Sequence, residues 1–160
     1  MPKTFLGFPE PLMYPDNWSI AEEPTDETEA PRPANGLMLE SPDGGFVDIR
    51  SVDRLDDEAI DEYFQEVLSD LEENYGEVER DNGIAVPEPL EAVIVEQTEF
   101  RFYYLDLLIL SRVIIIGDDD GEGPRYVFHA QAESRRFDEN EQLLQALMIQ
   151  LARCVEQANE

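Results

Sequence analysis

The segment 84–134 constrains the fold most, because nearly all of it has the composition of β-strands. Residues 91–105 and 111–116 are rich in β-branched and aromatic side chains, which pack well on a pleated sheet. Residues 125–134 alternate between two faces, as a strand does. We therefore predict three strands in this segment, with a bend near Leu105–Leu110 between the first and the second.

The most apolar part of this segment, residues 102–116, could be mistaken for a membrane span. It contains Asp106 and Arg112, and its fifteen residues fall short of the roughly 20 that a helix needs to cross a bilayer. We therefore interpret it as strands and expect no membrane partner.

Two strand pairs are predicted before this segment. Residues 36–41 and 45–52 flank Pro42-Asp43-Gly44, where proline presets φ and glycine accepts a positive φ, so they predict a β-hairpin. In its second strand Val47, Ile49 and Val52 are expected to face the core. Residues 12–20 predict a shorter hairpin, with a turn at Pro15-Asp16-Asn17 and a second strand from Trp18.

Helical periodicity appears twice. In residues 56–75 apolar side chains recur every three or four positions after an acidic first turn, and Gly76 follows as a stop signal. Residues 138–157 repeat the pattern, with Asp138 and Glu141 spaced as in a capping box. Together these patterns predict an α+β fold: one domain over residues 1–160, with a mostly antiparallel sheet and amphipathic helices packed on it. Residues 21–35 contain three prolines and many acids but no large apolar side chain, and predict a flexible loop within the domain.

The charge is extreme. The chain has 38 acidic residues against 11 basic ones, for a formal net charge of −27. Such a field repels phosphate backbones and anionic lipid headgroups, so we expect neither nucleic acid nor membrane as a partner. Basic proteins or cations would be favoured as partners, but the main expected role of the charge is to keep the surface hydrated and soluble. The N-terminus has no uninterrupted apolar stretch typical of a secretory signal, so we expect a cytoplasmic location.

The acidic cluster after Ile116 resembles a calcium loop only in part. Counted from Asp118, the third and fifth positions are Asp120 and Glu122, and the sixth is Gly123. The twelfth position must supply a bidentate carboxylate, but here it is His129. We therefore interpret the cluster as a hairpin turn between two core strands. A weak cation site made by Asp118, Asp120 and Glu122 stays open as an alternative.

Few residues are suited to catalysis. His129 is the only histidine and Cys154 the only cysteine, so a conventional metal ligand set and an intrachain disulfide are both excluded. Cys154 falls at an apolar helical position, where we expect a buried thiol. No serine lies in a nucleophile turn, no glycine-rich nucleotide loop is present, and Lys3 is the only lysine. We predict no catalytic, cofactor-binding or metal-binding residues, and no enzymatic activity.

An aromatic group lies near the N-terminus, formed by Phe5, Phe8, Tyr14 and Trp18. Core packing is the expected role of these side chains. An exposed aromatic patch that contacts a partner is the alternative.

The order of these motifs resembles the PsbP/Mog1-like superfamily of α/β/α sandwiches. The resemblance covers most of the chain and rests on a β-hairpin near YPDNWSI, the SPDGGFVDI hairpin and the strand-to-helix stretch RYVFHAQAESRRFDENEQLLQALMIQLA. It implies a non-enzymatic role, since members include a Ran-GTPase-binding import factor, extrinsic photosystem II subunits, small lipoproteins and bacterial adaptor chaperones. No functional residue of that superfamily maps onto this sequence.

The expected function is therefore a protein-interaction or adaptor module with an unidentified protein partner and no cofactor. Two alternatives remain open. One is an acidic decoy that mimics nucleic acid, and the other is a weak calcium-responsive module at Asp118, Asp120 and Glu122. An enzyme with a carboxylate pair in a pocket is the least favoured hypothesis.

Overall fold

A computed structural model of the chain describes residues 2–5, 12–20, 36–42, 44–52, 56–81, 93–117 and 125–158. Its elements are β1 Lys3–Phe5, β2 Leu12–Tyr14, β3 Ser19–Ile20, β4 Gly36–Glu40, β5 Phe46–Val52, α1 Asp57–Tyr75, β6 Glu79–Asp81, β7 Ile94–Tyr104, β8 Leu107–Ile116, β9 Arg125–Glu133, α2 Ser134–Glu139 and α3 Glu141–Ala158. A seven-stranded sheet has the order β3-β4-β5-β9-β8-β7-β6, and its neighbouring strands are all antiparallel. β1 and β2 form a second, two-stranded sheet.

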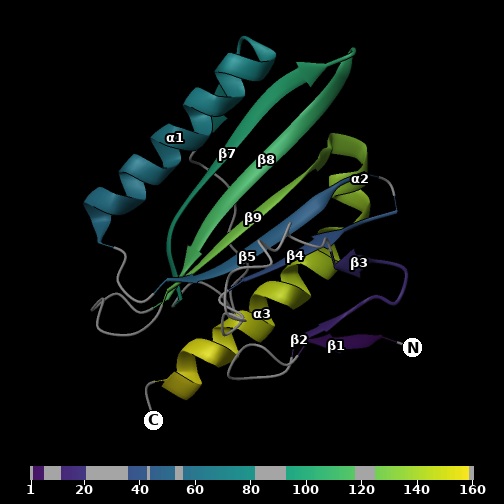
Figure 1. Ribbon diagram of the computed structural model, residues 1–160, viewed down its shortest axis with the longest axis vertical. Coiled ribbons are helices and arrows are strands. Elements are labelled where there is room, and N and C mark those ends of the chain that lie inside the picture. The colour runs from purple at the N-terminus through teal and green to yellow at the C-terminus, as the bar shows by residue number, and fades with distance from the viewer. Residues whose placement is uncertain are drawn as a thin grey trace, which may run out of the picture.

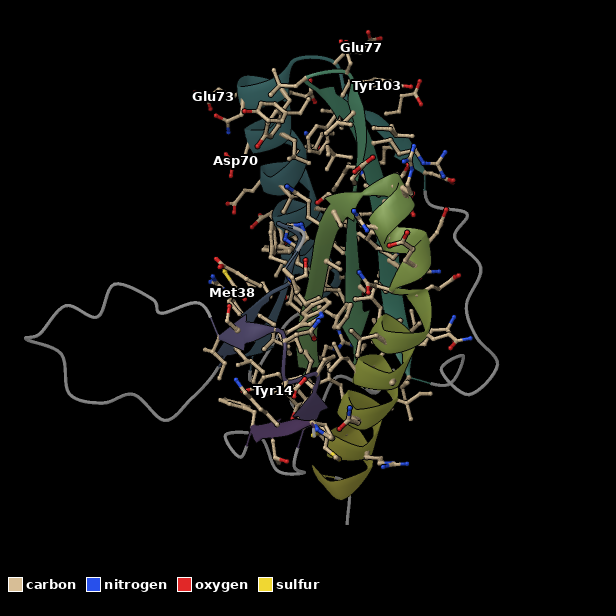
Figure 2. The ribbon with its side chains drawn as sticks, turned by 90° about the vertical axis from the view of Figure 1, so that its right-hand side faces the viewer. Tyr14, Met38, Asp70, Glu73, Glu77 and Tyr103 are labelled. Carbon is tan, nitrogen blue, oxygen red and sulfur yellow. The ribbon has the colours of Figure 1, made fainter. Side chains whose placement is uncertain are left out.

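Helices cover both faces of the large sheet, so the protein is a three-layered α+β domain, as predicted (Figure 1). The isoleucine run in β8 shows why both faces need a cover. Ile114 and Ile116 pack into the core on the α3 side, while Val113 and Ile115 pack into the core on the α1 side. Because successive side chains of a strand point to opposite faces, an uninterrupted apolar run is stable only in a strand covered on both sides. Figure 2 shows the sheet from its edge between these helices.

The predicted hairpin of β4 and β5 is confirmed. Gly44 has a φ of 92°, and the amide of Ser41 donates a hydrogen bond to the carbonyl of Gly45 at 2.9 Å. Val47 and Ile49 are buried on the α3 side. Val52 was expected on the same face, and this was wrong. It is an odd number of positions away, so it packs with the α1 core instead.

The two short strands in residues 12–20 exist, but the prediction that they pair with each other was wrong. β2 pairs with β1, and β3 pairs with β4 at the edge of the large sheet. A contact with Gln150 of α3 helps to explain why β2 does not pair with β3. The Gln150 side chain accepts a hydrogen bond from the amide of Met13 at 2.7 Å and donates one to the Met13 carbonyl at 3.1 Å. The polar groups of Met13 are thereby occupied by α3, so β3 finds its partner elsewhere.

Helix α1 matches its prediction closely. The Asp56 side chain caps it by accepting a hydrogen bond from the amide of Ala59 at 2.8 Å. Gly76, with a φ of 89°, ends it, and the glycine amide donates to the carbonyl of Glu72 at 2.9 Å. Ile60 and Phe64 of this helix are buried against the sheet.

The second helical region differs from its prediction. A short helix, α2, follows β9 directly, and α3 begins only at Glu141, after Asn140. Asp138 was expected to cap the long helix, and this was wrong because it lies within α2. The ring of Phe137 is buried in the α3-side core, which holds α2 on the sheet. The predicted flexible loop at 21–35 lies outside the described residues.

Candidate interaction surface

The hairpin of β7 and β8 extends beyond the rest of the sheet. The last pair between β8 and β9 joins Ile109 to Glu133, where the chain turns into α2. β7 and β8 continue to pair with each other as far as Tyr104 and Leu107. Figure 1 shows this hairpin rising past the end of β9, next to the end of α1. Its last residues therefore have no neighbouring strand from β9.

Four large side chains are exposed on this extension. The exposed fractions are 67% for Tyr103, 51% for Tyr104, 77% for Leu105 and 45% for Leu107. We call these four residues the hairpin tip. Tyr103 lies at one end of the molecule in Figure 2. Large apolar side chains gathered on one exposed segment are characteristic of interaction sites.

A groove of about 320 Å³ adjoins the hairpin tip on the α1 side of the sheet. Its aromatic wall is made by Tyr75, Phe102 and Tyr104. Tyr75 stacks on Phe102 with ring centroids 4.4 Å apart, and its ring meets that of Tyr104 edge to face at 5.6 Å. The termination of α1 at Gly76 places Tyr75 here, as the last residue of the helix. The opposite end of the groove is polar, with Glu133 and Arg136 in its lining.

The hairpin tip is built on an unfavourable turn. Leu105 and Asp106 have φ values of 49° and 65°, in the left-handed region. A two-residue hairpin turn of this kind strongly prefers Asn-Gly or Asp-Gly. A left-handed conformation costs a residue such as leucine roughly 1–2 kcal/mol, whereas aspartate adopts it more readily. The turn therefore exposes a leucine at a conformational cost. The bend predicted over residues 105–110 was too long, because Leu107–Leu110 belong to β8.

This strain gives a testable stability effect. The double substitution Leu105→Asn and Asp106→Gly is expected to raise the free energy of unfolding by about 1 kcal/mol, since both new residues tolerate a positive φ. Urea unfolding would measure it. Leu105→Ala is the matched control, because it removes the exposed side chain and keeps the strain, and should change stability by less than about 0.5 kcal/mol. Equal stability of all three proteins would show that the turn is relaxed.

The surroundings of the groove are acidic. The last turn of α1 contains Glu72 and Glu73 and no basic residue, and Glu77 follows two residues after Tyr75. A helix C-terminus also carries a partial negative charge from its backbone dipoles, which basic residues usually offset. Figure 2 shows Glu73 and Glu77 pointing away from the sheet at this end. Asp106 adds another carboxylate in the turn itself.

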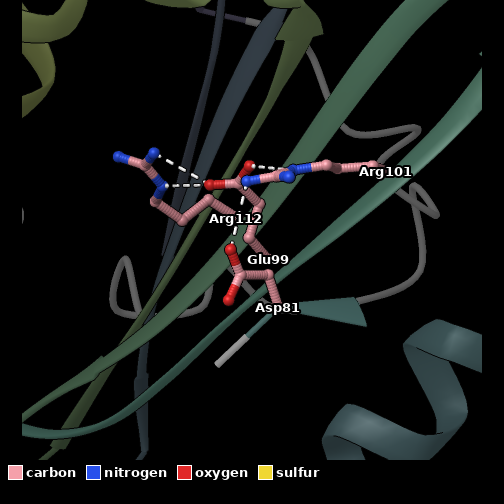
Figure 3. Close-up of polar contacts among 4 residues, drawn as sticks. All are labelled: Asp81, Glu99, Arg101 and Arg112. Carbon is pink, nitrogen blue, oxygen red and sulfur yellow. Dashed lines mark hydrogen bonds and ion pairs between the residues drawn. The ribbon is translucent and has the colours of Figure 1, made fainter. Parts of the chain in front are cut away.

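The nearby arginines are engaged in ion pairs. Figure 3 shows Glu99 between Arg101 and Arg112. Glu99 is 3% exposed, and its carboxylate lies 3.0 Å from Nε of Arg101 and 2.9 Å from Nη2 of Arg112. Arg101 also binds Asp81 at 3.1 Å. The hydrogen bond that Arg101 donates to Glu99 and the charge of that carboxylate, with a smaller effect from Asp81, raise the pKa of the Arg101 guanidinium. The cluster joins β6, β7 and β8, so it fixes the pairing of these strands.

Arg136, in the lining of the groove, likewise pairs with Glu139 at 3.0 Å. The positive charges of Arg101 and Arg136 are thus each offset by carboxylates of this chain.

His129 lies in β9 on the α1 side of the sheet, and Ser111 of β8 is its diagonal neighbour. The Oγ of Ser111 and the Nε2 of His129 are 2.6 Å apart. The ring of Phe46 meets the imidazole edge to face, with centroids 5.4 Å apart. Burial, with a smaller effect from the charge of Arg50, lowers the pKa of His129 to about 4. Ser111 is fully buried, so its hydroxyl cannot reach a substrate.

The other residues singled out from the sequence have mixed outcomes. Tyr14 and Trp18 are buried in the α3-side core and Phe5 packs against it, so core packing is confirmed for these three. Phe8 lies outside the described residues. Cys154 is buried, as predicted. Burial, with a smaller contribution from Cys154, raises the pKa of Tyr126 to about 12.

The acidic residues Asp118, Asp120 and Glu122 also lie outside the described residues, so the calcium hypothesis stays a prediction. The strands on both sides of them, β8 and β9, do pair, with Ile116 opposite Tyr126. In the part of the chain that the structure describes, no three His, Cys, Asp or Glu side chains are arranged so that they could hold a metal ion.

Sequence reasoning missed the hairpin tip. The signal that could have identified it is Tyr103-Tyr104-Leu105-Asp106-Leu107, a change of strand without a proline or glycine. No protein-family model matches this sequence, and no curated protein is significantly similar to it. Over the described ranges, no helix has the length and apolar character required to cross a membrane.

Proposed function

We propose that this protein is a non-enzymatic, cytoplasmic protein-interaction or adaptor module that binds its partner through the hairpin tip and the adjoining groove. One observation carries the proposal: Tyr103, Tyr104, Leu105 and Leu107 are exposed together on a hairpin that projects beyond the sheet. Water contact with such side chains is unfavourable, and burying them against a partner removes it. Tyrosines are also among the residues that contribute most to binding at interfaces.

The strained turn supports the same function. Strain in the backbone persists where the surrounding structure imposes it and is concentrated at functional positions. Here it places Leu105, the most exposed large apolar side chain in the described ranges, at the end of the hairpin. The resemblance to the PsbP/Mog1-like superfamily, which implies a non-enzymatic role, agrees with this proposal.

A non-enzymatic role is part of the proposal. His129 and Ser111 form the only pair in the described ranges that resembles a nucleophile with its base. Ser111 is fully buried, and a low pKa makes His129 a weak base. The groove lining contains neither of these residues.

The charge distribution on α1 favours a second candidate, the decoy that mimics nucleic acid. Exposed acids follow the outer side of this helix at Asp57, Glu58, Asp61, Glu62, Glu66, Asp70, Glu72 and Glu73. At 1.5 Å per residue, this is on average about one carboxylate every 3–4 Å of helix axis. Each strand of DNA has a phosphate about every 3.4 Å. A protein that binds nucleic acid could recognise this surface.

One capture experiment separates the two candidates. The tagged wild-type protein is used to capture partners from native lysate, together with a tip variant, Tyr104→Ser with Leu105→Ser. Ile20→Ser is the matched control, because Ile20 is also exposed but lies on β3, at the far edge of the sheet. We expect wild type and control to capture equal amounts of a partner protein, and the tip variant to capture about tenfold less of it, or still less.

A third variant, Glu62→Gln with Glu66→Gln and Asp70→Asn, removes charge from α1 without altering the hairpin tip. A partner lost with this variant and retained by the tip variant would support the decoy and contradict our proposal. Thermal unfolding of each variant verifies that it is folded.

A further inference from the structure

The hairpin tip and its groove have a chemical character that defines the kind of partner. We infer that they bind a peptide segment with an apolar anchor side chain flanked by arginines, and this inference rests on the proposed function. The proposed ligand is a basic segment of another protein.

The shape of the site indicates an anchor side chain. A groove of about 320 Å³ is at the small end of the range of ligand pockets, roughly 300–1,000 Å³, so it can admit one large side chain with its flanking backbone. Its walls include the rings of Tyr75 and Tyr104 and the aliphatic side chains of Leu107 and Ile109. These surfaces are complementary to a phenylalanine or a leucine.

The charge of the site requires basic flanks. Glu72, Glu73 and Glu77 lie at the C-terminal end of α1, which has no basic residue in its last turn to offset the helix dipole. Asp106 occupies the turn of the hairpin. Arg101 and Arg136 already bind carboxylates of this chain. A ligand with positive charge would complement the carboxylates at the end of α1 and in the turn.

Aromatic rings make arginine a better ligand than lysine here. A guanidinium stacks on aromatic faces and is more weakly hydrated than an ammonium group, so it loses less on leaving water. Tyr103 and Tyr104 belong to opposite faces of β7 and are both exposed, which offers a ring on each side of the hairpin. A second copy of this chain is a poor occupant, because two molecules with a charge of −27 repel each other.

Synthetic peptides test the inference directly. The reference probe has one phenylalanine between two pairs of arginines in a glycine-serine background. Three matched probes replace the arginines with glutamates, the arginines with lysines, or the phenylalanine with serine. By calorimetry at low salt, we expect the reference peptide to bind about tenfold or more tightly than the glutamate and serine peptides, and about threefold more tightly than the lysine peptide.

Protein variants then locate the bound peptide. Tyr104→Ser with Leu105→Ser should lower the affinity for the reference peptide by about tenfold. Glu73→Gln with Glu77→Gln should lower it by about fivefold. Glu58→Gln with Glu62→Gln is the matched control, because it removes the same charge at the other end of α1 and should alter affinity less than twofold. Size-exclusion chromatography with light scattering reports self-association.

The outcomes distinguish the inference from the proposed function. If the glutamate peptide binds as tightly and still depends on the hairpin tip, the inference is wrong and the proposed function stands. Equal weakening by the two α1 variants would show only diffuse charge attraction and overturn the inference. A dimer formed through the hairpin tip would also overturn the inference, as would the absence of peptide binding at millimolar concentration. Loss of the proposed function is shown separately, by lysate capture that the tip variant does not alter.

Discussion

Glu99→Ala is expected to lower the free energy of unfolding by about 3–5 kcal/mol, because it removes one partner from a buried ion pair and leaves the other charge uncompensated. The Glu99 side chain is only 3% exposed and binds Arg112, which is 18% exposed, at 2.9 Å. The guanidinium of Arg112 also lies over the ring of Phe137, 4.6 Å from its centroid, so it cannot move to solvent without losing that contact. Urea unfolding followed by circular dichroism measures the loss.

Two controls separate burial from charge. Glu139→Ala removes a carboxylate from the exposed pair with Arg136 and should cost less than about 1 kcal/mol. The double substitution Glu99→Leu with Arg112→Met removes both charges, and the methionine can still pack on Phe137. It should regain most of the stability that Glu99→Ala loses. A similar small loss for Glu99→Ala and Glu139→Ala would show that the Glu99 cluster is screened by water.

The Glu99 cluster also illustrates what sequence reasoning could not reach. Glu99 is one of 38 acidic residues, and no local pattern distinguishes it from the exposed ones. Its burial follows from the pairing of β7 with β8, which places Arg112 opposite it. Glu99 and Arg112 are 13 residues apart on the two strands of one hairpin, so their pairing depends on the position of its turn at Leu105 and Asp106, which the sequence does not mark.

Capping and turn residues did predict the ends of helices and the hairpin turns that they form by themselves. The start and the end of α1 could be predicted because Asp56 and Gly76 act within one turn of the helix. The hairpin of β4 and β5 followed from Gly44 in the same way. The prediction that β2 pairs with β3 failed because other segments contact both strands. β2 pairs with β1 and binds Gln150 of α3 through the backbone of Met13, and β3 pairs with β4.

The candidate site was missed for a related reason. Two-residue turns are recognised in sequences by asparagine and glycine, and this hairpin turns at Leu105 and Asp106 instead. The absence of asparagine and glycine made this turn unrecognisable in the sequence. It also makes the turn strained, and that strain suggests a function for it. Tyr75 is contributed to the groove by another element, α1, so only the folded chain brings it to Tyr104.

Acidification is expected to destabilise the protein through His129 by about 3 kcal/mol in total. The pKa of this imidazole is about 4 in the folded protein, below its ordinary value of 6.5, mainly because of burial. Between these two values the unfolded chain binds a proton that the folded chain does not, so unfolding becomes more favourable as the pH falls. The stabilisation is complete above pH 6.5 and is lost by about pH 4.

The test compares wild type with His129→Gln by urea unfolding from neutral pH to about pH 4. The many carboxylates also titrate near the acid end of this window, and relief of their mutual repulsion favours the folded state. Both proteins share that effect, so it cancels in their difference, and the excess loss in wild type isolates His129.

Ser111→Ala keeps the burial of the imidazole and the charge of Arg50, the two causes of the lowered pKa, and should therefore retain the wild-type pH dependence. Parallel stability curves for wild type and His129→Gln would mean that water reaches the ring and that its pKa is close to the ordinary value.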